Sequence, residues 1–387
     1  MLAGGAVLVN AVGLPNALRL HNDGMDTLSV RVGSRPYDIF FAGGLSGFAP
    51  AVRSVVPKAH LAFVVGDTNV EPKVRAVAAE LEQIGLRVET ALIPAGEPSK
   101  NLFTAAFQYD RLAEMKADRS TLVVALGGGV VGDLAGFVAA TYNRGLPLVM
   151  VPTTLLAMVD SSVGGKVGLN HPQGKNLIGA FHQPSLVWIG SDFLKTLPER
   201  EYRSGLAEVV KMGVALDAEL FSWLETSAEA ILQRDESAIR RIVRRSCELK
   251  AGIVERDERE ETGLRAVLNY GHTFGHAFEA VGGYGSWLHG EAVSAGMVCA
   301  SILAERLGRI DADVTRRQVA LLNRLELPVG PKPEWPIASL IESMQRDKKA
   351  IGGKLRFVLP TRLGHVELVD GVSEDVVSDV LKASGAS

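Results

Sequence analysis

The sequence predicts an α/β domain with a Rossmann-like topology, followed by an all-α domain. Up to residue 197, short apolar segments typical of buried strands alternate with helical segments, as in proteins built on a parallel sheet. From Pro198 onward, almost every long segment has the apolar periodicity of a helix. We therefore expect domains at residues 26–197 and 198–387, preceded by a poorly ordered extension at residues 1–25.

The composition is that of a globular protein and excludes several functional classes. Of its 387 residues, 47% are hydrophobic and 22% are charged, which suffices for a large core. The net charge of -3 gives no indication of nucleic-acid binding. Two cysteines, Cys247 and Cys299, exclude a disulfide framework and fit a reducing compartment, so we expect a cytoplasmic protein. The N-terminus lacks the basic leading region of a signal peptide, and no apolar run reads as a membrane span.

The first half predicts a hairpin and a parallel sheet. Apolar and polar side chains alternate at residues 27–32 and 37–42, which is typical of two paired strands. Further strands are expected at 61–66, 87–93, 121–126, 148–152 and 185–190, and helices at 71–84, 101–116 and after the glycines that follow residue 126. Residues 152–181 are polar and glycine-rich, which predicts a long loop. Such a loop is often functional, although a solvated surface loop has the same composition.

The second half predicts helices. Helical periodicity covers residues 198–225, 228–257, 265–281, 289–308, 311–326 and 336–346. Residues 355–360, LRFVLP, fit either a late strand or an extended segment.

Three of the eight histidines lie within residues 272–289. His272 and His276 are four residues apart, which places both imidazoles on one face of a helix. His289 follows a glycine-rich turn. Imidazole is a common zinc ligand, so two of these histidines and one carboxylate would leave an open coordination position for a substrate. An isolated HxxxH pattern more commonly marks a helix cap and a polar face.

Glu208 offers the carboxylate for such a site. It lies three residues before Lys211 on one face of a predicted helix, among apolar residues. A partly buried carboxylate needs a partner or a metal, which makes Glu208 the natural third ligand for His272 and His289. An ordinary ion pair between Glu208 and Lys211 explains the spacing as well, and it is the commoner arrangement.

A glycine-rich turn follows the predicted strand at 121–126. Gly127, Gly129 and Gly132 form the pattern G-x-G-x-x-G between a strand and a helix. Bare backbone N–H groups at the positive end of a helix suit a pyrophosphate. No acidic residue ends the next strand to hold a ribose, but Asp67 ends an earlier one. The same glycines also fit a tight turn for helix–sheet packing, and the two interpretations have about equal weight.

The chain resembles the 3-dehydroquinate synthase family in six ordered motifs between about residues 60 and 370. These are GGGVVGDLAGF, VPTTLLAMVDSSVGGK, GKNLIGAF, SGLAEVVK, LNYGHTFGHAFE and WLHGEAV. The resemblance implies an NAD-binding α/β domain, a helical domain with a divalent metal (Zn²⁺, with Co²⁺ as the alternative), a small-molecule substrate and a homodimer. From the net charge and the apolar runs, we expect no nucleic-acid or membrane partner.

The same resemblance implies roles for individual residues. The metal ligands are Glu208, His272 and His289, and His276 faces the substrate. The NAD contacts are Asp67, Asn69, Glu97, Lys100, Gly129, Val130, Val131, Gly132, Asp133, Thr153, Thr154, Lys166, Lys175, Phe193, Leu194, Lys195 and Thr196. The substrate contacts are Arg144, Asp160, Lys166, Asn176, Lys211, Lys250, Arg265, Asn269, His276 and one lysine of the pair Lys348 and Lys349.

The implied activity is the conversion of 3-deoxy-D-arabino-heptulosonate 7-phosphate to 3-dehydroquinate and phosphate, a redox-neutral carbon–oxygen lyase reaction. Alternatives are another sugar phosphate cyclase, which forms a valiolone or an inosose, or a metal-dependent polyol dehydrogenase. A nucleotide-binding protein without catalysis is a further alternative. The motifs around Asn269, His276 and Glu291 have the form found in dehydroquinate synthases.

Overall fold

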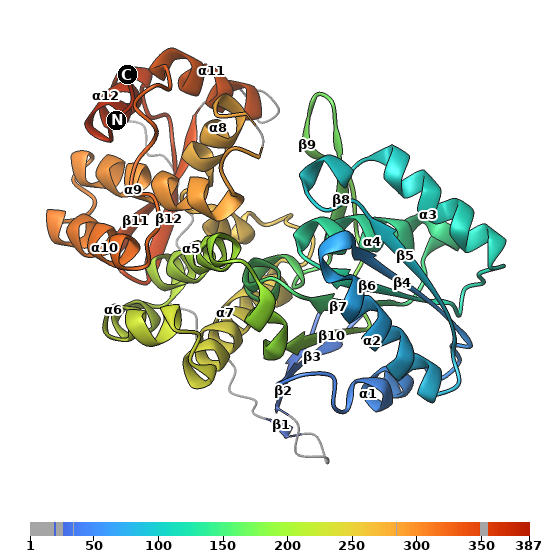
Figure 1. Ribbon diagram of the computed structural model, residues 1–387. Helices are drawn as coiled ribbons and strands as arrows, with labels where there is room; N and C mark the ends of the chain where they lie inside the picture. Colours follow the sequence, from blue (N-terminus) through green and yellow to red (C-terminus); the bar gives the residue numbers. More distant parts are fainter. Residues whose placement is uncertain (1–18, 21–25, 34, 284, 349–354) are drawn as a thin grey trace. The chain divides into compact units, whose positions relative to one another are not determined.

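The computed structural model describes residues 19–20, 26–33, 35–283, 285–348 and 355–387, which form two compact units (Figure 1). The sheet unit holds the described residues up to Leu197 together with Lys250–Arg259. The helical unit holds Pro198–Leu249 and Glu260–Ser387. Lys250–Arg259, which the sequence analysis assigns to the second domain, thus belongs to the first. Apart from residues 19–20, the predicted extension at 1–25 lies outside the described residues.

An eight-stranded sheet forms the core of the sheet unit, in the order β1-β2-β3-β10-β7-β6-β4-β5. Its strands are β1 (Arg19–Leu20), β2 (Asp26–Val30), β3 (Tyr37–Ala42), β4 (Leu61–Asp67), β5 (Arg87–Ile93), β6 (Leu122–Gly127), β7 (Leu148–Pro152) and β10 (Leu186–Gly190). The pairs β1–β2 and β2–β3 are antiparallel, and all pairs from β3 to β5 are parallel. The predicted α/β fold class, the hairpin and the parallel sheet are confirmed.

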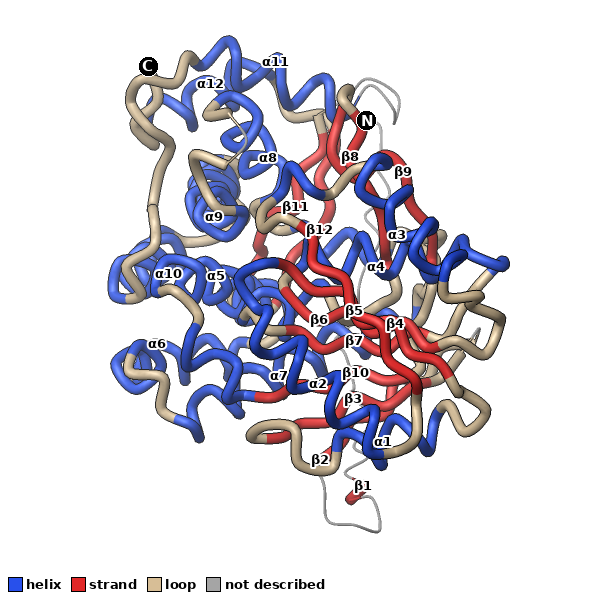
Figure 2. The backbone as a smooth tube through the Cα atoms, turned by 45° about the vertical axis from the view of Figure 1, so that its right-hand side comes forward, coloured by secondary structure: helices blue, strands red, loops and turns tan. Residues whose placement is uncertain are grey.

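Helices flank this sheet (Figure 2). They are α1 (Phe48–Val55), α2 (Glu71–Gln83), α3 (Leu102–Glu114) and α4 (Gly129–Thr141). Helix α2 packs on β4 and β5, and α4 packs on β6 and β7. The central strands β6, β7 and β10 are buried along their whole length, which explains their unbroken apolar sequences.

The order in which the chain adds strands to the sheet reverses at β4. After β4 it continues to β5 on one side, and β6 then pairs with β4 on the other side. In parallel α/β sheets, ligands bind at the carboxyl ends of the strands beside such a reversal. The ends of β4 and β6 are therefore the place to look for a bound cofactor.

The prediction of one long loop at residues 152–181 is wrong. The segment contains a π-helical turn, η4 (Ala157–Ser161), and an antiparallel hairpin of β8 (Lys166–His171) and β9 (Gly174–Phe181). A Cβ on Gly168 would lie 2.7 Å from the Ile178 carbonyl oxygen, and one on Gly179 would lie 2.8 Å from the Val167 oxygen. The glycines thus allow the two strands to approach closely, and they also remove the side-chain alternation from which a strand is recognised.

The helical unit is mostly helical, as predicted. Its elements are α5 (Glu199–Leu216), α6 (Ala218–Leu232), most of α7 (Glu236–Arg256), η6 (Leu264–Asn269), α8 (His272–Val281), α9 (His289–Arg306), α10 (Ala312–Arg324), α11 (Ile337–Lys348) and α12 (Glu374–Ala383). It also contains the hairpin of β11 (Arg356–Arg362) and β12 (His365–Asp370), so the all-α prediction is too narrow and the alternative of a late strand is correct.

The predicted helix at 198–225 is two helices. Asp217 ends α5 and caps α6, because its carboxylate accepts the N–H groups of Glu219 and Leu220. Helix α9 is the centre of the unit and packs against α5, α8, α10, α12 and β11. Cys247 and Cys299 are both buried and form no disulfide with each other.

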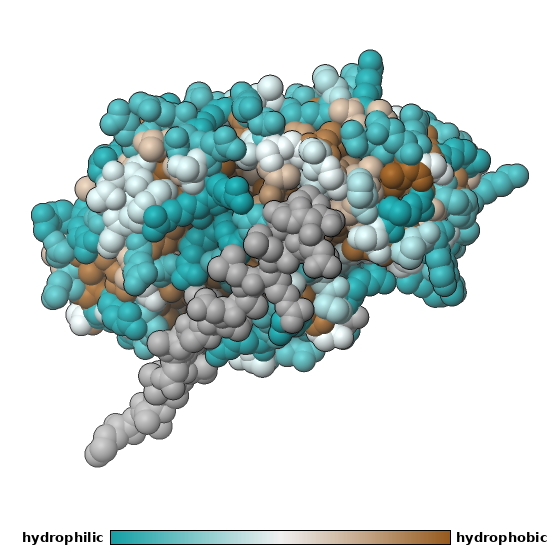
Figure 3. Space-filling view, turned by 90° about the horizontal axis from the view of Figure 1, so that it is seen from below, coloured by the Kyte–Doolittle hydropathy of each residue, from teal (hydrophilic) through white to brown (hydrophobic). Residues whose placement is uncertain are grey.

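The surface carries no extended apolar band in the view of Figure 3, where hydrophilic residues predominate and apolar ones gather in small groups. In the described part of the chain, no helix combines the length and apolar character needed to cross a membrane.

Candidate metal and dinucleotide sites

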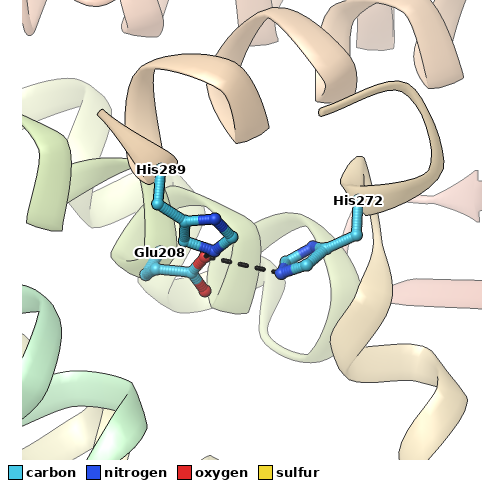
Figure 4. Close-up of side chains that lie close together, drawn as sticks. All are labelled: Glu208, His272 and His289. Carbon is cyan, nitrogen blue, oxygen red and sulfur yellow. Dashed lines mark ion pairs between the residues drawn. The ribbon is translucent and has the colours of Figure 1, made fainter. Parts of the chain in front are cut away.

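Three potential metal ligands converge in the helical unit, each from a different helix (Figure 4). Glu208 lies in the middle of α5, whereas His272 and His289 are the first residues of α8 and α9. Their donor atoms all lie within 4.8 Å of one another. Glu208 Oε1 lies 3.8 Å from His272 Nε2 and 3.6 Å from His289 Nε2.

Glycines allow the three helices to come this close. A Cβ on Gly290 would lie 1.8 Å from the carbonyl oxygen of Ser204, one turn before Glu208 on α5. A Cβ on Gly296 would lie 2.2 Å from the carbonyl oxygen of Gly271, the residue before His272. Side chains at these two positions would push α9 away from α5 and α8, and so the ligands would separate.

The cluster fits a divalent metal by its chemistry and its orientation. Two atoms that each bind one Zn²⁺ at about 2.0–2.2 Å are about 3–4 Å apart, as the carboxylate and imidazole atoms are here. His272 Nδ1 lies 3.2 Å from the carbonyl oxygen of Tyr270, and His289 Nδ1 lies 3.3 Å from Glu279 Oε2. Both rings therefore have an acceptor for the Nδ1 proton, and Nε2 of each ring, which faces Glu208, is the atom that would bind a metal.

The charges around this cluster perturb its pKa values strongly. Burial raises the pKa of Glu208, which is 1% exposed, but the Lys211 ammonium and the imidazoles outweigh burial and hold that pKa well below its usual range. Burial and the Lys211 ammonium lower the pKa of His272 to about 3. Burial also lowers the pKa of His289, but the carboxylates of Glu208 and Glu279 outweigh it and raise the value to about 10. The carboxylate is thus ionised, as a metal ligand must be.

Other predicted substrate residues lie around this cluster or elsewhere in the helical unit. His276 is exposed, and its ring centroid lies 5.4 Å from that of His272, but it is not one of the three converging ligands. Lys211 and Arg265 are buried, and Asn269 is exposed at the end of η6. The Lys348 side chain and all of Lys349 lie outside the described residues.

The glycine-rich turn lies in the sheet unit, at the carboxyl end of β6. Gly128 is the N-cap of α4, so the first N–H groups of that helix point out of the turn. A Cβ on Gly127 would lie 2.6 Å from the Val131 side chain. A small hollow is lined here by Ala125, Gly127, Gly128, Gly132, Met150, Pro152, Ala157, Ser161 and Ser162. An accessible helix N-terminus beside a hollow fits a pyrophosphate.

Several predicted NAD contacts flank this turn. Asp67 is the last residue of β4, which pairs with β6, and Asn69 lies in the short helical turn that follows it. Thr153 and Thr154 follow β7 on the other side of β6. The Thr153 N–H donates to the Gly127 carbonyl oxygen at 2.9 Å. At this end of the sheet, the strand order therefore brings together segments far apart in the sequence.

The loop at Glu97–Lys100 is joined to the same region by two contacts. Lys100 forms an ion pair with Asp133 of α4, and burial raises the pKa of that aspartate although the ammonium opposes the shift. Asn170 Nδ2 of β8 donates to Glu97 Oε1 at 2.7 Å. Asn170 was not predicted as a site residue, because an asparagine in a glycine-rich segment gives no signal of its own.

Further predicted residues of the sheet unit lie at four places. Lys250 Nζ donates to Asp160, to both its backbone oxygen and Oδ1 at 2.7 Å. Lys166, Lys175 and Asn176 lie on the β8–β9 hairpin, and Arg144 has a left-handed backbone with φ 66°. In η5 (Ser191–Thr196), Phe193 and Leu194 are buried whereas Lys195 and Thr196 are exposed.

Glu279 contacts a candidate ligand but was not predicted from the sequence. It is buried on α8, seven residues after His272, and therefore lies on nearly the same helix face. A glutamate in the apolar run AFEAV was the available signal, since a buried carboxylate requires a partner.

Comparisons with known proteins agree with this architecture. Residues 90–204 match the family model for the 3-dehydroquinate synthase N-terminal domain, and residues 205–350 match the model for its C-terminal domain. A solved structure of 2-epi-5-epi-valiolone synthase from Streptomyces hygroscopicus subsp. jinggangensis 5008, with NAD⁺ and Zn²⁺ bound, is 29% identical. It has a TM-score of 0.82 and an alignment over 90% of this chain and 96% of that one.

Two further structures show the breadth of the fold. A 2-deoxy-scyllo-inosose synthase complexed with carbaglucose-6-phosphate, NAD⁺ and Co²⁺ is 24% identical, with a TM-score of 0.82 over 92% of this chain and 99% of that one. A maleylacetate reductase from Rhizobium sp. strain MTP-10005 is 16% identical, with a TM-score of 0.62 over 93% and 99% of the two chains.

Proposed function

Because the chain belongs to the 3-dehydroquinate synthase family of sugar phosphate cyclases, we propose that it is a 3-dehydroquinate synthase. It would convert 3-deoxy-D-arabino-heptulosonate 7-phosphate to 3-dehydroquinate and phosphate, a step of the shikimate pathway. The sequence of events would be transient oxidation at C5, phosphate elimination, reduction, ring opening and intramolecular aldol closure. The observation that carries the proposal is the convergence of Glu208, His272 and His289 with correctly oriented imidazoles.

The chain offers residues for both cofactors that this reaction needs. Glu208, His272 and His289 would hold a divalent cation, and the N-terminus of α4 would hold the pyrophosphate of NAD. NAD supplies reversible hydride transfer and the cation polarises the reacting hydroxyl and carbonyl. The neighbour that is 29% identical binds NAD⁺ and Zn²⁺, which supports this assignment.

The basic residues supply binding of the anionic substrate. Guanidinium and ammonium groups bind phosphate and carboxylate through charge-assisted hydrogen bonds, a role proposed for Arg144, Lys166, Lys250 and Arg265. Lys250 is already oriented by Asp160. His276 would hold or move a proton at the substrate phosphate, since its exposed imidazole lies beside that of His272.

A related cyclase activity is the second candidate, because the neighbours include synthases of a valiolone and of an inosose. These products lack the carboxylate of 3-dehydroquinate. The substrates would differ accordingly, and so a substrate panel separates the candidates.

The experiment is to incubate the purified protein with NAD⁺, Zn²⁺ and one substrate at a time, while phosphate release and carbocycle formation are followed. The panel contains the heptulosonate 7-phosphate, a heptulose 7-phosphate without the carboxylate, and glucose 6-phosphate. We expect rapid phosphate release and formation of 3-dehydroquinate with the first substrate alone. Turnover of either neutral-sugar phosphate in preference would reject the dehydroquinate synthase assignment and favour the second candidate.

We further propose that the enzyme works as a homodimer in the cytoplasm, as its family implies. Light scattering coupled to size-exclusion chromatography would measure a mass of twice 41.3 kDa. A monomeric mass at assay concentration would reject the dimer without affecting the assignment of the reaction.

A further inference from the structure

Glu279 is a buried carboxylate in contact with a candidate metal ligand, and no role has been assigned to it so far. We propose that it is a positioning residue, which holds the His289 imidazole so that Nε2 faces Glu208. The inference rests on the metal site proposed above, but it does not depend on which sugar phosphate the enzyme uses.

The geometry gives Glu279 this role. Its side chain is 6% exposed, and Oε2 lies 3.3 Å from His289 Nδ1, on the side of the ring opposite to Nε2. Glu279 is on α8 and His289 begins α9, so the contact joins two helices that pack closely along their length. A carboxylate that accepts the Nδ1 proton fixes both the tautomer and the orientation of the ring.

The two histidine ligands differ in what holds them. His272 Nδ1 faces a backbone oxygen, that of Tyr270. The Tyr270 hydroxyl is in turn fixed between two acceptors that compete for its single proton, Met297 O at 3.0 Å and Gln318 Oε1 at 2.8 Å. His289, with 33% of its side chain exposed against 13% for His272, contacts a side chain instead. A substitution of Glu279 can therefore free the His289 ring to turn, whereas the backbone acceptor of His272 cannot be removed by replacing a side chain.

The test compares Glu279→Gln and Glu279→Ala with the wild-type protein, without substrate. Zn²⁺ affinity is measured by competition with a chelator, and the ligand geometry is followed through the visible absorption spectrum of the Co²⁺-loaded protein. We expect Glu279→Ala to weaken Zn²⁺ binding about 10- to 100-fold and to alter the Co²⁺ spectrum. Glu279→Gln retains an oxygen acceptor, so it should restore the spectrum and part of the affinity.

A matched control is Glu367→Gln. Glu367 forms an ion pair with Arg309 in the same unit, with 19% of its side chain exposed, and is not one of the cluster residues. This variant should lose stability but keep the affinity and the Co²⁺ spectrum of the wild type. Folded Glu279 variants with wild-type affinity and an unchanged spectrum would overturn the proposal. A wild-type protein that binds no metal would overturn it together with the metal site, whereas a different substrate would leave it intact.

Discussion

The candidate metal cluster and the glycine turn would hold their cofactors in opposite ways. The cluster consists of three side chains from three helices, and their donor atoms meet within 4.8 Å. The turn offers backbone N–H groups at the start of α4, at the end of a strand that lies between two others. Binding at the cluster depends on which side chains are present. Binding at the turn depends on the space that small residues leave free. Substitutions should therefore damage the two regions through different mechanisms.

Replacing a ligand should have the largest effect. We expect Glu208→Gln, His272→Ala and His289→Ala each to lose bound metal and activity and to remain folded, because each removes one of three ligands. Elemental analysis measures the metal, and circular dichroism verifies the fold. Stoichiometric zinc in any one of the three folded variants would remove that residue from the ligand set. NAD affinity serves as the internal control and should be unchanged.

His276 tests whether the metal cluster has a fourth ligand. Its spacing from His272 makes it a candidate ligand, whereas the resemblance assigns it to the substrate phosphate. We expect His276→Ala to keep its metal and to slow phosphate release by ~10²–10⁴-fold, since the lost group acts on a proton. Metal content and single-turnover phosphate release would be measured on this variant. A metal-free His276→Ala protein would mean that the cluster has four ligands.

Gly290 tests whether helix approach builds the metal cluster. A Cβ at this position would lie 1.8 Å from the Ser204 backbone oxygen, so Gly290→Ala must move α9 away from α5. We expect a loss of about 1–3 kcal/mol in stability and a weaker affinity for Zn²⁺. Thermal unfolding and chelator competition measure the two effects. Gly43→Ala is the matched control, because no atom lies within 4 Å of the added Cβ. Wild-type zinc affinity in Gly290→Ala would show that the close approach of α9 to α5 is not needed to position the ligands.

Gly127 tests the glycine turn in the same manner. A Cβ there would lie 2.6 Å from the Val131 side chain. Val131 can move away only if the start of α4 shifts. We expect Gly127→Ala to weaken NAD⁺ binding about tenfold, which corresponds to the lower end of the cost of overpacking. Calorimetric titration measures the affinity, and zinc content should remain at the wild-type value. Loss of zinc with unchanged NAD⁺ binding would contradict the assignment of NAD to the glycine turn and of the metal to the cluster.

The same contrast explains what the sequence could predict. The strands β4, β6, β7 and β10 were predictable because burial on both faces requires unbroken apolar runs. The β8–β9 hairpin was not, since Gly168 and Gly179 leave no side chains whose alternation could be recognised. The three convergent ligands were inferred from residue type, spacing and resemblance. Glu279 was missed because its partner lies ten residues away, across a turn, and only the packing of α8 against α9 brings them together.

The central claim is that this chain performs a redox-neutral cyclisation in which NAD is used and regenerated. The most direct measurement is mass spectrometry of the product formed from heptulosonate 7-phosphate that carries deuterium at C5. If a hydride leaves C5 to bound NAD⁺ and returns to the same carbon, the 3-dehydroquinate retains the deuterium and free NADH does not accumulate. Deuterium in free NADH, formed in an amount equal to the product, would contradict the account and identify a net dehydrogenase.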